Sequence, residues 1–307
     1  MQYQVIKLKF RTAVHLGDGG LTRGNNTFYA DTLFSALCHE AIKLNNLDEL
    51  VSAVKNNRIR ISDGLPYIGD TLYIPRPYLV LDIQNAGDSV MKKTLKKLEY
   101  IPVNQLDNYL KGKLDISKEY EYFHQNFGTS SLIEKARIVE GDDAEPFAIS
   151  VYQYKKGSGL YVCVGYESDN DYYMLTDLLV ALSYTGIGGK RSSGYGKFEI
   201  SLSKPEESLL ERLDNNQYSS YISLASAFPR EEELEQVVSG ASYRLIRRGG
   251  FIDSSTYAQN HQKKKDSYLM ASGSYFEERF EGELFDVSHK GVHPVFRYAK
   301  PMMMGVM

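Results

Sequence analysis

An α+β fold is predicted by three features of the 307-residue sequence. Residues 3–14 alternate between apolar and charged side chains, which is typical of a half-buried strand. Residues 31–44 and 171–184 place apolar side chains at helical spacing. When an irregular stretch at about 46–146 is set aside, the elements follow the order strand, helix, strand, strand, helix, strand.

The individual elements have local signals of their own. Asp31 stands where a side chain can cap the first helix. Two β-rich runs at 147–154 and 160–166 flank residues 155–159, KKGSG, which predicts a hairpin. Residues 198–202 alternate again and are expected to form the last strand.

This order of elements is that of a ferredoxin-like fold (βαββαβ), and its sheet has the topology of the RNA recognition module. We expect a first ferredoxin-like domain at 1–204, carrying the insertion at about 46–146 and closed by Lys204 and Pro205. A second, degenerate ferredoxin-like domain is expected at 205–307. Its predicted extended segments are 221–228, 242–252 and 294–306.

The composition is that of an ordinary globular protein, with 42% hydrophobic and 24% charged residues. No apolar run approaches the roughly 18 residues of a membrane span, and the N-terminus has a strand pattern, unlike a signal peptide. Cys38 and Cys163 are too few for a disulfide framework or a zinc site. We expect a cytoplasmic protein without a metal or cofactor.

The formal net charge of −3 differs from the basic balance of most free-standing nucleic-acid-binding domains. RNA binding would therefore depend on local patches, and basic runs occur at 190–191, 247–248 and 263–265. Solvated surface is the alternative for each run. The 24 Tyr and 13 Phe supply rings that can pack in a core or stack on bases.

A glycine-rich loop, GIGGKRSSGYGKF at 186–198, is the most informative motif. Glycine allows backbone N–H groups to approach a phosphate closely, and the lysines, arginine and serines add charge and hydrogen bonds. Two known phosphate loops do not fit, since Tyr184 stands at a glycine position of the Walker motif and Arg191 at one of the dinucleotide motif. A purely structural glycine loop is the alternative.

This loop resembles the glycine-rich loop of the RAMP superfamily of CRISPR proteins. More narrowly, the chain resembles the fourth Csm subunit of type III-A complexes through further segments in the same order along the chain. These are HLGDGG at 15–20, ADTLFSAL at 30–37, YIPRP at 73–77, EPF at 145–147, RRGGF at 247–251, KKKDSY at 263–268, ASGSYF at 271–276 and HPVFRYAKP at 293–301.

The resemblance implies two ferredoxin-like folds and no enzymatic role. It also implies that the protein caps the repeat-derived 5′ handle of the crRNA within an antiviral ribonucleoprotein. The implied protein partners are the large polymerase-like signature subunit and the adjacent backbone RAMP subunit. Neither a membrane nor a small-molecule substrate is expected as a partner.

The expected RNA contacts fall into three regions. In the glycine-rich loop, basic residues meet phosphates and Tyr195 either stacks or packs. After the first strand, His15 stacks on a base, donates to a phosphate, or is a satisfied turn histidine. In the third region an aromatic ring lies among cations, as suits single-stranded RNA. The residues are Gly188, Gly189, Lys190, Arg191, Ser192, Ser193 and Tyr195; His15, Gly17, Asp18, Gly19 and Gly20; and Arg247, Arg248, Phe251, Lys263, Lys264 and Lys265.

Two further contacts are expected outside these regions. Arg76, between Pro75 and Pro77, projects from a rigid extended strut, unless the prolines are purely structural. Ser272 and Gly273 are candidates for the second domain's equivalent of the glycine-rich loop.

Two other functions are weighed against RNA capping. An endoribonuclease would use His15 with a distant histidine as acid and base, whereas a pure protein scaffold would touch no RNA. The lone carboxylate of Asp18 makes a poor metal site, and residues 140–143, EGDD, lack the tight hairpin of a nucleotide-cyclising motif.

Overall fold

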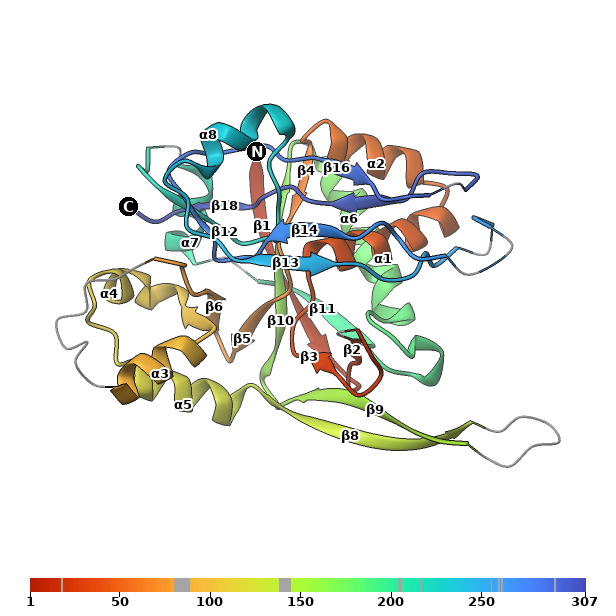
Figure 1. The fold of residues 1–307 in the computed structure, drawn as a ribbon, viewed down its shortest axis with the longest axis horizontal. Coiled ribbons are helices and arrows are strands. Elements are labelled where there is room, and N and C mark those ends of the chain that lie inside the picture. Colours follow the sequence, from red (N-terminus) through yellow and green to blue (C-terminus); the bar gives the residue numbers. More distant parts are fainter. Residues whose placement is uncertain are drawn as a thin grey trace.

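The computed structural model describes residues 1–17, 19–79, 89–137, 145–203, 206–215, 217–254, 256–258, 260, 262–289 and 291–307. Helices and strands are mixed throughout this part of the chain, as the α+β prediction requires (Figure 1). Residues 140–143, Lys204, Pro205 and Asp18, which carried sequence predictions, lie outside the described residues.

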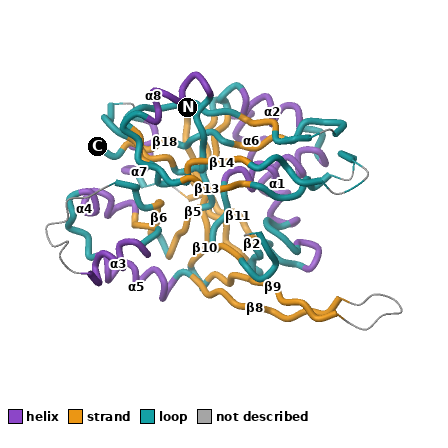
Figure 2. The backbone as a smooth tube through the Cα atoms, in the orientation of Figure 1, coloured by secondary structure: helices purple, strands orange, loops and turns teal. Residues whose placement is uncertain are grey.

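An antiparallel sheet runs through the middle of the molecule (Figures 1 and 2). Helices α1 (Ala30–Lys43), α2 (Leu47–Lys55) and α6 (Asp169–Thr185) pack together against it. The strand order is β11 (Phe198–Ser203), β1 (Gln2–Phe10), β10 (Ser158–Tyr166), β5 (Leu65–Ile68), β6 (Thr71–Pro75) and β7 (Tyr100–Pro102), and β4 (Ile59–Ile61) also pairs with β10.

The helix ends show where local sequence signals succeed. Ser168 and Asp171 form a capping box at the start of α6, so each satisfies an N–H group of the other. The predicted cap of α1 was wrong. The N-cap residue is Tyr29, and the N–H of Ala30 donates to the Asp63 carboxylate at 2.7 Å. Asp31 lies in the first turn, where its carboxylate is available to other partners.

The predicted hairpin of residues 147–154 and 160–166 was also wrong. Both strands exist, but β9 (Glu145–Tyr154) pairs with β8 (Gly128–Arg137) in a ribbon that projects from the body (Figure 1). Strand β10 instead pairs with β1, β4 and β5. Nearly every residue of β10 is buried, so it requires neighbours on both edges, whereas β8 is exposed along most of its length.

The stretch 46–146 does more than decorate the core, because β4 to β7 within it extend the central sheet. The helices between β6 and β8 form a lobe at the left of Figures 1 and 2. Tyr73, Phe123 and Phe127 pack their rings together inside this lobe. Its helices are α3 (Ser89–Lys97), η1 (Val103–Gln105), α4 (Leu106–Leu110) and α5 (Ile116–Asn126).

The C-terminal hundred residues form short strands that cross the upper part of Figure 1. The segments predicted at 221–228, 242–252 and 294–306 all contain strands, but shorter ones. The strands pair as β15 (Tyr275–Phe276), β12 (Tyr221–Ser223) and β18 (Met303–Gly305); β13 (Leu245–Arg248) with β14 (Ser267–Met270); and β16 (Leu284–Asp286) with β17 (Phe296–Tyr298). The helices here are α7 (Glu207–Asp214), η3 (Glu231–Glu233) and α8 (Leu234–Val238).

The two halves of the chain share one main hydrophobic core. Ile222, Leu224 and Tyr298 from the C-terminal half are buried in the same cluster as the central sheet. At their joint Asp63 accepts hydrogen bonds from the N–H groups of Ala30 and Ser226. The halves are therefore held together by apolar packing and by a buried polar hub. No helix in the described part of the chain is long and apolar enough to cross a membrane.

Candidate nucleic-acid interface

The glycine-rich loop lies between α6 and β11 and contains one turn of 3-10 helix, η2 (Arg191–Ser193). Lys190 precedes this turn with a left-handed φ of +58°, an uncommon conformation for a residue with a Cβ. Ser192 and Ser193 are exposed, and Lys190 and Arg191 are partly exposed. The tip of the loop therefore offers the cations and hydroxyls that the sequence predicted to meet phosphates.

The glycines of this loop have a packing role that the sequence did not reveal. The N–H of Gly189 donates to the carbonyl oxygen of His15 at 2.8 Å. A Cβ on Gly188 would lie 2.6 Å from the same oxygen, and one on Gly189 would lie 2.7 Å from the His15 ring. Both residues are therefore glycine because they pack on His15, and the Gly189 N–H is not available to a phosphate.

His15 itself is 5% exposed, which favours the alternative of a satisfied turn histidine over base stacking or a phosphate contact. Its Nδ1 lies 2.6 Å from the carbonyl oxygen of Ser150 and donates to it. The histidine is a satisfied turn residue that joins two loops. The second loop is exposed at Gly17, Gly19 and Gly20, next to the hairpin of β2 (Leu16–Gly17) and β3 (Gly24–Asn25).

The projecting ribbon lies against the glycine-rich loop through two cation–ring contacts. Lys190 Nζ lies 5.1 Å from the centre of the Phe147 ring on β9, and Lys135 Nζ lies 4.5 Å from that of Tyr195. Tyr195 therefore has a cation over its ring already, which favours the packing alternative for this residue.

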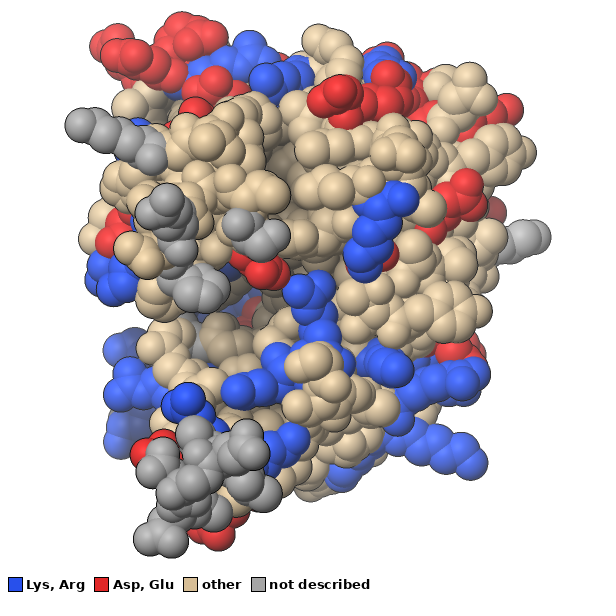
Figure 3. Space-filling view, turned by 90° about the vertical axis from the view of Figure 1, so that its right-hand side faces the viewer, with Lys and Arg blue, Asp and Glu red and all other residues tan. Residues whose placement is uncertain are grey.

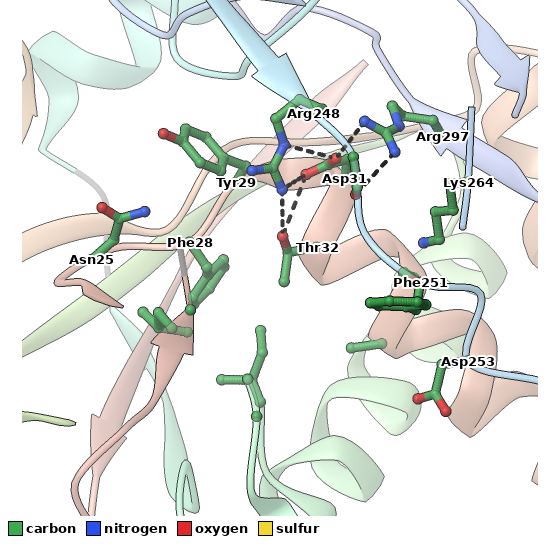
Figure 4. Close-up of a pocket in the computed structure, with 18 of the residues that line it drawn as sticks. Asn25, Phe28, Tyr29, Asp31, Thr32, Arg248, Phe251, Asp253, Lys264 and Arg297 are labelled. Carbon is green, nitrogen blue, oxygen red and sulfur yellow. Dashed lines mark hydrogen bonds and ion pairs between the residues drawn. The ribbon is translucent and has the colours of Figure 1, made fainter. Parts of the chain in front are cut away.

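A cavity of about 290 Å³ opens beside the loop and is drawn in Figure 4. Its walls come from both halves of the chain: the start of α1, the loop at Gly188 and Gly189, and the C-terminal segments around Arg248, Lys264 and Arg297. A larger groove of about 1390 Å³ adjoins it and shares His39, Arg191, Asp253 and Lys264. Residues from all three predicted contact regions, such as Gly17, Arg191 and Lys264, therefore line one cavity.

Asp31 organises the cations of the cavity. Arg248 donates from Nε and Nη2 to the two carboxylate oxygens at 3.0 and 2.8 Å, and its guanidinium lies 4.2 Å from the centre of the Tyr29 ring. Burial opposes the charge of Arg248, but the carboxylate more than offsets it and raises the arginine's pKa. Figure 4 shows Arg297 pointing toward the same carboxylate, with Nη1 4.0 Å away.

The mouth of the cavity carries a second set of charges. Arg191 pairs with Asp253 at 3.2 Å, and Nε2 of His39 lies 3.5 Å from the same carboxylate. Burial lowers the pKa of Lys264, which lies between the cavity and the groove. Figure 3 draws the side of the molecule that lies at the right in Figure 1. Lys and Arg side chains gather across its lower half, whereas Asp and Glu lie mainly in its upper half.

In the third predicted region, some side chains are paired within the protein and others are exposed. Phe251 has a 61% exposed ring, its backbone pairs with Lys263, and Lys263 Nζ lies 5.7 Å from the ring centre. Arg247 is exposed and pairs with Asp266. Lys265 is exposed, and its N–H donates to the carbonyl oxygen of Val287. The interleaving of a ring with cations is present, but Arg248 is committed to Asp31.

The remaining predicted contacts lie elsewhere, and their side chains or backbone are engaged within the protein. Arg76 donates from Nε to the carbonyl oxygen of Leu98 at 2.8 Å instead of projecting outward. Gly273 is buried against the Arg76 backbone, and Ser272 bonds to the Asp63 carboxylate. Ser272 and Gly273 thus lie at the joint between the halves, which does not support the expectation of a second phosphate loop there.

Two charged residues of the cavity, Asp31 and Arg297, were not predicted as site residues. Asp31 was assigned to a helix cap, and Arg297 was only part of the HPVFRYAKP segment. Both are charged residues within otherwise apolar segments. This pattern predicts that each charge is buried and paired, but it does not identify the residue with which it pairs. Among the described residues no cluster of His, Cys, Asp and Glu is placed to hold a metal ion.

Known protein families and relatives match nearly the whole chain. The family model for the RAMP superfamily matches residues 7–199, and the model for the CRISPR Csm4 C-terminal domain matches residues 216–306. A Csm4 protein of Mycobacterium tuberculosis (strain CDC 1551 / Oshkosh) is 35% identical over 293 residues, covering 95% of this chain and 94% of the relative. One from Streptococcus thermophilus is 31% identical over 309 residues and covers 98% of both.

Solved structures share the fold. A chain from the Csm3–Csm4 subcomplex of a type III-A CRISPR-Cas interference complex superposes with a TM-score of 0.67 at 20% identity, covering 99% of both chains. A chain from a Csm1–Csm4 cassette in complex with cA4 gives 0.64 at 18% identity, covering 99% of this chain and 98% of the other. From the sequence matches and the family models, this chain belongs to the Csm4 family of the RAMP superfamily.

Proposed function

We propose that this chain is a non-catalytic RNA-binding subunit of a cytoplasmic type III-A CRISPR (Csm) effector complex, and that it holds the repeat-derived 5′ handle of the crRNA. The relatives that match over almost the full length are all Csm4 proteins of CRISPR systems. The low exposure of His15 favours a non-catalytic role over an endoribonuclease, because an acid–base histidine must reach its substrate.

The observation that carries the proposal is the meeting of the glycine-rich loop and the 247–265 segment at one groove. The groove combines cations such as Lys43, Lys190 and Arg191 with apolar side chains such as Ile252 and Phe296. Single-stranded RNA needs both, since charge follows its backbone and apolar or aromatic surface faces its bases. A net charge of −3 is compatible with this, because Lys and Arg side chains gather across the lower half of the face drawn in Figure 3.

We also propose that the chain docks a large polymerase-like subunit and a backbone subunit, corresponding to Csm1 and Csm3 in the solved assemblies. The fold is proposed to be two ferredoxin-like domains at 1–204 and 205–307. For the first, the order β11, β1, β10, β4 is the sheet order of a βαββαβ unit with α1 and α6 as its helices. For the second, the support is the separate family model over 216–306.

The test is to purify the complex through a tag on this chain and to sequence the bound RNA. The double variant Lys190→Ala with Arg191→Ala removes two charges at the loop tip. The matched control, Lys111→Ala with Lys113→Ala, removes two exposed charges from the lobe. We expect the loop variant to lose most of the bound RNA and the control to retain it. The wild-type RNAs should share one repeat-derived 5′ end.

Three other results would each replace the proposal. Partners without RNA in the wild type would indicate a pure scaffold. Bound RNA with random 5′ ends would contradict the proposal that the chain binds the repeat-derived 5′ handle. If His15→Ala caused uncut precursor RNA to accumulate while the complex remained assembled, the chain would be an endoribonuclease.

A further inference from the structure

Arg297 has an unpaired nitrogen inside the cavity. Its side chain is 3% exposed, its Nη2 donates to the carbonyl oxygen of Gly249 at 3.3 Å, and its Nη1 has no hydrogen-bond partner among the described residues. The nearest carboxylate, that of Asp31, lies 4.0 Å from Nη1 and already accepts two bonds from Arg248. A buried cationic N–H without an acceptor is costly, so the geometry is suited to an incoming anion.

The charges of the cavity walls do not balance. Asp31 is engaged by Arg248, and Asp253 is engaged by Arg191. Lys264 lines the same cavity and forms no ion pair within the described part of the chain. Arg297 and Lys264 therefore leave an excess of positive charge in a small polar space, which complements a phosphate group.

An exposed ring stands at the same cavity. Phe251 lines it and exposes 61% of its side chain, and Figure 4 shows it on the same side of the cavity as Lys264. The volume of about 290 Å³ is near the lower end of the range for small-molecule pockets, about 300 Å³. The space therefore suits one nucleotide better than a longer stretch of RNA.

We propose that this cavity binds a single nucleotide of single-stranded RNA, with its phosphate on Arg297 and Lys264 and its base against Phe251. The inference depends on the proposed function, because it takes RNA as the ligand. The neighbouring nucleotides then lie in the adjoining groove, which shares Arg191 and Lys264 with the cavity. A free nucleotide has the same chemistry, and the experiment distinguishes the two sources.

The experiment measures binding of short single-stranded RNA to the full chain by fluorescence anisotropy across a salt series. Lys264→Gln and Phe251→Ala test the cavity, and Lys111→Gln is the matched control, because Lys111 is exposed on the lobe and lies outside the cavity lining. Each cavity variant is expected to weaken binding about tenfold, since one charged hydrogen bond or one stacked base is lost. Lys264→Gln should also reduce the salt slope by about 0.7. The control should change affinity less than twofold.

Arg297→Lys serves as a third variant, with its folding checked by thermal melting because the side chain is buried. Cavity variants that bind RNA as well as Lys111→Gln does would overturn the inference while leaving RNA binding in place. Wild-type protein that binds no RNA would overturn the proposed function first. Adenosine monophosphate that competes at the same concentration as the RNA would identify a free nucleotide as the ligand and overturn the RNA assignment.

Discussion

Two glycine-containing loops of this protein follow similar sequence patterns but occupy opposite environments. The loop at 186–198 is partly exposed at Lys190 and Arg191, beside a groove rich in cations. The loop at Ser272 and Gly273 is inside the joint between the two halves, where the Gly273 N–H donates to Ser223 and its carbonyl oxygen accepts from Tyr78. Glycine marks close backbone approach in both loops, and only the residues between the glycines show whether the approach is to solvent or to protein.

The largest expected effect is the loss of stability when one glycine of each loop is replaced by alanine. Gly273 has a φ of +87°, and a Cβ there would lie 2.6 Å from the carbonyl oxygen of Arg76, whereas Gly194 has a φ of +86° and open space around it. Gly273→Ala should lose about 2–5 kcal/mol of unfolding free energy, through left-handed strain plus overpacking. Gly194→Ala should lose about 1–2 kcal/mol, through strain alone. Urea denaturation of the two variants measures the difference.

Equal losses at Gly273 and Gly194 would contradict the assignment of the 272–273 loop to the joint. The RNA affinity of each folded variant serves as a control. Gly273→Ala should leave RNA affinity unchanged, because Ser272 and Gly273 do not line the cavity or the groove.

The next effect concerns the acid at the same joint. Burial raises the pKa of Asp63 from 3.8 to about 6, despite hydrogen bonds from Ser226, Ala30 and Ser272. Its protonated form therefore contributes stability that is present below pH 3.8 and is lost as the pH rises through 6. Asp63→Asn keeps an acceptor oxygen and does not titrate. Relative to wild type, the variant should gain about 3 kcal/mol of stability between pH 4 and pH 7.

Chemical denaturation at several pH values tests this expectation. Asp70→Asn, at the exposed turn between β5 and β6, is the control for loss of one negative charge. If the difference between Asp63→Asn and wild type were independent of pH, the buried hub would not hold Asp63 as the structure shows it.

The sequence predicted helices α1 and α6 and strands β1, β9, β10 and β11 to within a few residues, because strong periodicity fixes such elements locally. It did not predict α2 or strands β4 to β8, which lie in the stretch set aside as an insertion. It failed where the partner of an element is distant. The ten residues of β9 pair with β8 instead of β10, and no local pattern distinguishes those neighbours. For the candidate site, the loop tip and Phe251 were predicted from chemistry that shows in the residue type. Asp31 and Arg297 were missed because their meaning depends on a contact across 266 positions of sequence.

His15 is a residue whose type suggested a function that its burial does not favour. Its residue type favoured a role in binding or catalysis, but its position between two glycine-containing loops makes it the surface on which Gly189 packs. The conformations of both loops therefore depend on a side chain that is hardly accessible to a ligand. Residue type identifies possible chemistry, and burial decides whether the chemistry is available.

The smallest expected effect concerns Tyr195, for which stacking on RNA and packing were both open. Lys135 Nζ lies 4.5 Å from the ring centre, so Tyr195→Phe should preserve the contact and Tyr195→Leu should lose about 0.5–1 kcal/mol of stability. RNA affinity should stay within twofold in both variants, because the ring already has a partner. Thermal melting and RNA titration of the pair measure the two quantities. If Tyr195→Leu weakened RNA binding tenfold with unchanged stability while Tyr195→Phe did not, the ring would face a base, and the RNA path would extend from the groove onto the ribbon.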